Sequence, residues 1–129
     1  MRPPAGLCDD RGVPQTVLIV DDHDDFRASV SALLEAEGFA VLGEAADGGG
    51  AIVEAERLRP DVVLLDIQLP DVDGFTVAER LAAANEPPAV VLISSREAEA
   101  YGPRLDAAAA RGFISKRELS GAALAALIS

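Results

Sequence analysis

Three short runs of β-branched and aliphatic residues constrain the fold of this chain more than any other feature. They span residues 17–20, 62–65 and 90–93, and a polar residue directly follows each of them. Four such residues are too few for a helix and are typical of a strand that is buried on both faces. Weaker runs at residues 40–42 and 112–114 are two further candidates. The sequence therefore predicts five strands.

Helical patterns separate these strand candidates. An apolar stripe at helical spacing begins at Phe26 and stops at Gly38, a residue type that commonly ends helices. The next pattern follows the glycine run 48–50, which we interpret as a helix start, and ends at Pro60. The remaining helices are expected over residues 75–82, 96–110 and 119–128. In the alanine-rich residues 96–110, Gly102-Pro103 favours a helix that starts near Pro103 or breaks there.

Five strands that alternate with five helices predict an α/β fold, in which a doubly wound five-stranded parallel sheet is flanked by five helices. The chain has 129 residues, enough for one such domain. Residues 1–15 contain proline, glycine and aspartate but no apolar run, so we expect a flexible N-terminal arm. The domain is expected to span residues 16–129.

The charge and the cysteine content restrict the partners and the compartment. The formal charge of −11 and the pI near 4.3 argue against direct nucleic-acid binding and against binding to an anionic membrane. No apolar run approaches the roughly 18 residues of a membrane helix. Cys8 is the only cysteine, which excludes an internal disulfide framework and fits a reducing compartment. We expect a cytoplasmic protein.

Polar residues with reactive or ligand-binding side chains follow the predicted strands. Asp21-Asp22, Asp66, Ser94 and Lys116 each stand at or near a strand's carboxyl end. In open α/β sheets, ligands bind beyond these ends, so we expect the side chains to converge on one edge.

Three carboxylates at one edge repel one another unless a proton or a cation is shared between them. Mg²⁺ prefers oxygen ligands and leaves room for a phosphate oxygen. A carboxylate can then attack phosphorus, while Lys116 and Ser94 interact with phosphoryl oxygens. This pattern favours phosphoryl transfer to Asp66.

These motifs resemble a response-regulator receiver domain of the CheY-like superfamily. The resemblance rests on Asp21-Asp22 after the first strand, the run 65–74 around Asp66, Ser94, and Phe113 three residues before Lys116. Arg117 after the lysine, and the run 119–124, are similar to receivers of the NarL/LuxR type. The resemblance implies a flavodoxin-like sheet with strand order 2-1-3-4-5.

The resemblance also assigns roles to residues. It implies that Asp66 is the phosphoacceptor, and that Asp22, Asp66 and the carbonyl of Gln68 bind Mg²⁺, with Asp21 holding the ion through water. Ser94 and Phe113 would be a switch pair that responds to phosphorylation. The implied partners are a histidine kinase or phosphotransfer protein, a downstream protein target, and a second copy of the chain after phosphorylation.

Two other functions compete with this interpretation. Residues 71–76 resemble the Asp-x-Asp-Gly-x-Thr motif of haloacid-dehalogenase-class phosphohydrolases, with Asp71 and Asp73 as the acids. In that class the first acid should end a buried strand, whereas the buried strand here ends at Asp66. A binding module that never carries phosphate would lack one of the acids or the lysine, and none is lacking. Whether the chain is a complete regulator or the receiver of a longer DNA-binding protein is open at this stage.

Overall fold

The computed structural model describes residues 14–128. Five strands alternate with five helices in this part of the chain, and two short 3₁₀ turns adjoin the fourth and fifth helices. The strands are β1 (Thr16–Val20), β2 (Ala40–Ala45), β3 (Val62–Asp66), β4 (Ala89–Ser94) and β5 (Gly112–Ser115). The helices are α1 (Asp24–Ala36), α2 (Gly48–Leu58), α3 (Gly74–Ala82), α4 (Pro103–Asp106) and α5 (Gly121–Ile128).

The strands form one parallel sheet in the order β2-β1-β3-β4-β5. Val17 in the centre pairs with Val41 on one side and with Val62 on the other. Every residue of β3 is buried, as expected for a strand covered on both faces. The predicted fold class and strand order are confirmed.

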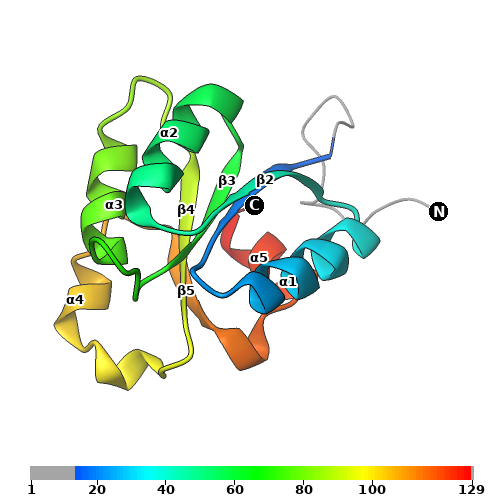
Figure 1. The fold of residues 1–129 in the computed structure, drawn as a ribbon. Coiled ribbons are helices and arrows are strands. Elements are labelled where there is room, and N and C mark those ends of the chain that lie inside the picture. Colours follow the sequence, from blue (N-terminus) through cyan, green and yellow to red (C-terminus); the bar gives the residue numbers. More distant parts are fainter. Residues whose placement is uncertain (1–13, 129) are drawn as a thin grey trace.

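Helices cover both faces of the sheet (Figure 1). α1 and α5 lie on one side, where Leu34 and Leu124 are fully buried against Ile19 and Leu64 in one hydrophobic cluster. α2, α3 and α4 lie on the other side, where a second cluster includes Phe75 and Val77. The alternation of side chains along each strand thus supplies both cores, and the polar strand ends are left at the sheet edge.

Aspartate side chains begin two of the helices. Asp47 caps α2 by accepting a hydrogen bond from Gly50 N at 2.6 Å, which confirms that the glycine run starts a helix. Asp73 caps α3 by accepting a hydrogen bond from Thr76 N at 2.9 Å. Both caps satisfy backbone N–H groups that have no partner inside the helix.

The fourth helix is much shorter than the sequence predicts. It starts at Pro103, as expected, but ends at Asp106, and residues 107–110 form a turn and bends although the alanine run predicted helix. Directly after residue 110 the chain pairs with β4, because Arg111 N donates a hydrogen bond to the Val90 carbonyl at 2.7 Å. The helix propensity of alanine stabilises these residues less than the pairing with β4 does. A helix of one turn also has little stability of its own.

The predicted N-terminal arm, residues 1–15, falls largely outside the described residues, and Cys8 lies there as well. Within the described part, the Gln15 carbonyl already accepts a hydrogen bond from Ala40 N at 2.9 Å. The domain boundary at residue 16 stays a prediction. Among residues 14–128, no helix is long and apolar enough to cross a membrane.

Candidate functional site

The carboxyl ends of the central strands bring the predicted polar residues to one edge of the sheet. Asp66 is the last residue of β3 and Ser94 the last residue of β4, while Asp21 follows β1 and Lys116 follows β5. Asp21, Asp66 and Ser94 are buried, although their side chains are polar. Buried polar groups need partners, so the contacts among these residues define the site.

Lys116 lies between the two buried carboxylates. Its ammonium forms an ion pair with Asp21 Oδ2 and lies 3.3 Å from Asp66 Oδ2. The same nitrogen lies 4.4 Å from the centroid of the Phe26 ring, a cation–π arrangement that the sequence did not indicate. The Phe26 ring therefore helps to hold the Lys116 ammonium beside the two carboxylates.

The two buried acids ionise differently. Burial raises the pKa of Asp66 to about 6, and the nearby Asp21 carboxylate also raises it, against the opposing effects of the Gln68 N–H and the Lys116 ammonium. Burial also disfavours the charged form of Asp21. Its hydrogen bonds with Lys116 and with the His23 backbone nevertheless hold the pKa of Asp21 below its usual value. Asp21 is therefore the more acidic member of the pair, and Asp66 is the carboxyl group whose ionisation the metal-free site disfavours.

Asp22 and His23 complete the cluster at its exposed side. His23 Nδ1 lies 3.0 Å from Asp21 Oδ1 and 3.0 Å from Asp22 Oδ1. His23 is exposed beside the acid pair. One ligand atom from each of Asp21, Asp22, His23 and Asp66 falls in a group whose members all lie within 4.8 Å of one another. This spacing allows one small cation to contact several carboxylates.

The donor set fits a hard divalent cation such as Mg²⁺. Asp21 Oδ2 is fully buried and, apart from its ion pair with Lys116, has no hydrogen-bond partner within the described residues. Asp66 Oδ1 accepts one hydrogen bond, from Gln68 N at 3.1 Å. A single lysine does not neutralise three clustered carboxylates, and oxygen ligands of this kind are those that Mg²⁺ prefers.

Ser94 has other hydrogen-bond partners than the acid cluster. Its Oγ accepts a hydrogen bond from Arg96 N at 3.0 Å and lies 2.5 Å from Tyr101 Oη. No hydrogen bond within residues 14–128 joins Ser94 to Asp66. Phe113, the other predicted switch residue, is half-buried in β5, and its ring centroid lies 6.1 Å from that of Tyr101.

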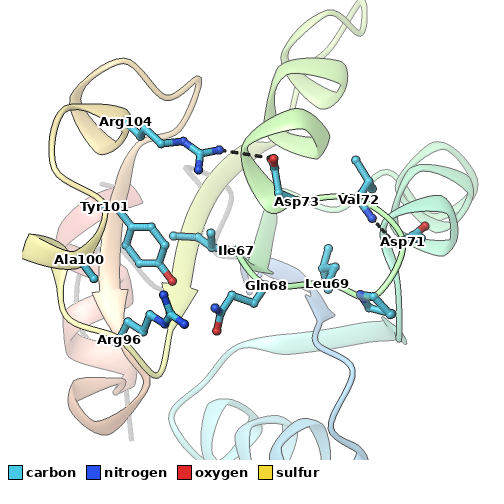
Figure 2. A pocket seen from close by; sticks show the side chains of 11 residues that line it. Ile67, Gln68, Leu69, Asp71, Val72, Asp73, Arg96, Ala100, Tyr101 and Arg104 are labelled. Atoms are coloured by element: carbon cyan, nitrogen blue, oxygen red, sulfur yellow. Dashed lines mark hydrogen bonds and ion pairs between the residues drawn. The ribbon is translucent and has the colours of Figure 1, made fainter.

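A pocket adjoins the site between the loop after β3 and the segment after β4 (Figure 2). Gln68 and Ile67 line it on one side, and Arg96, Tyr101 and Arg104 line it on the other. The sequence did not single out Tyr101 as a site residue. The available signal was its position seven residues after Ser94, in a segment with no clear period.

Asp71 and Asp73, the acids of the competing phosphohydrolase motif, have structural partners. Asp71 accepts hydrogen bonds from Gly48 N at 2.8 Å and Gly49 N at 2.9 Å, and these lower the pKa of its carboxyl group. Asp73 caps α3 and pairs with Arg104 at 3.4 Å. Neither residue ends a strand, so this geometry does not place a nucleophile at the sheet edge.

A parallel sheet of order 2-1-3-4-5 with an acid cluster and a lysine at its carboxyl edge defines a receiver domain. The family model for the response regulator receiver domain matches residues 17–128. The chain therefore belongs to this family of two-component signalling proteins. Receiver domains bind Mg²⁺ at an acidic cluster of this kind.

Curated relatives include a DNA-binding transcriptional activator and a response regulator. The chain is 34% identical over 101 residues to the DNA-binding transcriptional activator EvgA of Escherichia coli K12, which covers 78% of this chain and 50% of EvgA. It is 34% identical over 113 residues to the response regulator GacA of Pseudomonas viridiflava, which covers 87% of this chain and 51% of GacA. The chain thus spans about half the length of these relatives.

Solved structures that are similar to this chain are also receiver domains. The signal receiver domain of a response regulator NarL from Mycobacterium tuberculosis is 33% identical with a TM-score of 0.78, over 88% of this chain and 95% of that domain. CheY in a CheX–CheY–BeF₃–Mg²⁺ complex from Borrelia burgdorferi is 29% identical with a TM-score of 0.81, over 99% of this chain and 96% of that one. The predicted resemblance to receivers, including the NarL type, is confirmed.

Proposed function

We propose that this receiver accepts a phosphoryl group on Asp66 from a histidine kinase or phosphotransfer protein. The observation that carries the proposal is the burial of Asp66 at the end of β3, beside both Asp21 and the ammonium of Lys116. One carboxylate oxygen of Asp66 attacks the donor's phosphorus atom, and the bond from phosphorus to the donor's imidazole nitrogen breaks with its electron pair staying on that nitrogen. The products are an acyl phosphate and a free imidazole.

Each neighbouring residue has a defined task in this proposal. Lys116 pairs with a phosphoryl oxygen once the transfer moves negative charge onto that group. Asp22, Asp66 and the Gln68 carbonyl would hold Mg²⁺, and Asp21 would help to position the ion. The bound ion supplies positive charge that offsets the repulsion between donor phosphate and carboxylates. The chain acts here as a phosphoacceptor that assists its own phosphorylation and dephosphorylation, without multiple turnover on a free substrate.

The conformational response completes the proposal. Phosphorylation biases Ser94 and Phe113 toward a second arrangement, which changes the face formed by α4, β5 and α5. A downstream protein, an attached output domain or a second receiver then recognises that face. We place the protein in the cytoplasm, the compartment in which a receiver meets its phosphoryl donor.

The test follows phosphoryl incorporation from a small acyl phosphate over time. The wild-type chain with Mg²⁺ should incorporate phosphate to a stoichiometry no greater than one, and excess chelator should stop incorporation. Asp22→Ala should raise the Mg²⁺ concentration needed for half-maximal rate by about tenfold or more, as expected for loss of a metal-binding carboxylate. Asp25→Ala removes an equal charge from an exposed position on α1 and serves as the control.

Three results would contradict the proposal. Phosphoryl incorporation at an unchanged rate in the presence of chelator would show that the reaction does not need Mg²⁺. Repeated release of phosphate from a generic phosphate ester would instead support a phosphohydrolase. Equal effects of Asp22→Ala and Asp25→Ala would show that only the overall charge matters.

A further inference from the structure

Tyr101 contacts the residue whose hydroxyl group is expected to respond to phosphorylation. Its Oη lies 2.5 Å from Ser94 Oγ, and Ser94 is fully buried. Ser94 Oγ also accepts the Arg96 N–H at 3.0 Å. Because a serine hydroxyl has one proton and two lone pairs, these two partners satisfy most of its hydrogen-bonding capacity. In this arrangement Ser94 makes no hydrogen bond to a carboxylate of the acid cluster within the described residues.

The Tyr101 ring is held in place by two other aromatic rings. Its centroid lies 5.9 Å from that of Phe75 at an interplanar angle of 68°, and 6.1 Å from that of Phe113 at 59°. The pair with Phe75 is edge-to-face and the pair with Phe113 is tilted, and aromatic pairs at these distances are favourable. Figure 2 shows the ring pointing into the pocket, with Arg96 and Gln68 near the end that carries the hydroxyl group. The hydroxyl therefore meets Ser94 from a fixed direction.

We propose that Tyr101 is a positioning residue for Ser94, whose hydroxyl it holds by a hydrogen bond that must break before Ser94 can turn to a phosphoryl oxygen on Asp66. This inference rests on the proposed function. Whichever of the two hydroxyl groups donates, Oγ cannot keep its 2.5 Å contact with Tyr101 and also move to the phosphoryl group. The hydrogen bond thus opposes the phosphorylated arrangement.

A direct consequence is that Tyr101 changes its surroundings when the site is loaded. Its hydroxyl loses Ser94 as a partner, and its ring contacts Phe75 at the start of α3 and Phe113, the other switch residue, in β5. The event at Ser94 therefore reaches both elements through one side chain.

The chain offers a specific spectroscopic probe, because Tyr101 is its only tyrosine. With ring-¹³C tyrosine, the full chain gives the NMR signals of one ring. In the unloaded protein, Ser94→Ala should shift these signals, whereas Ser95→Ala, at the exposed neighbouring position, should not. Beryllofluoride with Mg²⁺, the pair present in the Borrelia complex, should also shift them, and Asp66→Asn should abolish that response.

A double-mutant cycle on beryllofluoride affinity separates positioning from packing. Tyr101→Phe keeps the ring and removes the hydroxyl, so it should tighten the binding of beryllofluoride by about two- to tenfold, the range expected for one neutral hydrogen bond. The same substitution in a Ser94→Ala background should have no effect, because the hydroxyl partner is already gone.

The outcomes distinguish this inference from the proposed function. Wild-type protein that binds no beryllofluoride overturns the proposed function, and this inference with it. Binding without any change in the Tyr101 signals overturns this inference alone. So does an effect of Tyr101→Phe that persists at full size in the Ser94→Ala background, since that result assigns the residue to packing.

Discussion

The carboxyl group of Asp66 is almost fully buried and lies 3.3 Å from Lys116 Nζ, with the Asp21 carboxylate close by. Burial and Asp21 raise its pKa to about 6, whereas Lys116 and the Gln68 N–H act in the opposite direction. An ionised Asp66 is therefore a destabilising group in the metal-free fold. The residue that performs the proposed chemistry lowers the stability of the domain until a cation or phosphoryl group changes its surroundings.

We predict that Asp66→Asn stabilises the metal-free protein at pH 7.5 by about 1–3 kcal/mol, because each unit of pKa shift corresponds to about 1.4 kcal/mol. The raised pKa means that protonated Asp66 favours folding below about pH 4, and that this contribution is lost as the pH rises to about 6. The difference between variant and wild type should therefore be near zero at the acidic end and grow through this window. Chemical denaturation in chelator at several pH values measures it.

Asp71→Asn is the matched control for this prediction. The pKa of Asp71 is lowered by the N–H groups of Gly48 and Gly49, so ionised Asp71 favours folding. That contribution is present at neutral pH and is lost as the pH falls below the usual range of an aspartate. Stabilisation by both substitutions would show that removing any negative charge suffices, and would refute the specific role of Asp66.

At this scale, the sequence predicts the residues that directly follow strands and misses those that reach the site from elsewhere. Asp21, Asp66 and Lys116 meet because parallel strands deliver their carboxyl ends to one edge. Phe26 and Tyr101 contact site residues from α1 and from the segment before α4. Their approach depends on helix packing and loop path, which no periodicity in the sequence specifies.

Among the elements, the connection from β3 to α3 is the most tightly constrained part of the site. Gly74 begins α3, and its N–H donates to the Ile67 carbonyl at 2.7 Å. A Cβ atom at Gly74 would lie 2.5 Å from the Asp66 carbonyl oxygen and 2.7 Å from Ile67 Cα. Both are backbone atoms, so neither can move aside by a change of rotamer. The first turn of α3 thus fixes the end of the strand that carries Asp66.

We predict that Gly74→Ala destabilises the domain by about 1–3 kcal/mol, the usual cost of inserting a group into a closely packed site. It should also slow phosphorylation, because the backbone of Asp66 must shift. Gly49→Ala is the control, since the nearest atom to its added Cβ is Asp71 Oδ2 at an ordinary 3.6 Å. Thermal unfolding of the two variants measures the difference. Equal melting temperatures for them would contradict this explanation of the close approach.

Helix α4 shows where element prediction fails. Pro103 correctly marked its start, but the alanines at 107–110 are not helical, because the chain returns to pair with β4 through Arg111. Local propensity is a weak guide when a long-range hydrogen bond decides the path. The other helices have an amphipathic stripe or a terminating residue that agrees with their packing, so their positions could be predicted.

For the whole molecule, the fold follows from the alternation of apolar strand runs with amphipathic helices. β3 has every residue buried, and one helical layer covers each face of the sheet (Figure 1). Part of the chain's net charge of −11 lies at the carboxyl edge of the sheet, where Asp21, Asp22 and Asp66 surround a single lysine. The chain spans about half the length of its curated relatives EvgA and GacA.

The most direct test of the central claim is site-resolved mass spectrometry of the intact chain after incubation with a small acyl phosphate and Mg²⁺. Wild-type protein and the Asp73→Asn variant should each gain the mass of one phosphoryl group, and fragmentation should place it on Asp66. Asp66→Asn should gain none under the same conditions. A phosphoryl group retained by Asp66→Asn, or located on Asp71 or Asp73, would contradict the account.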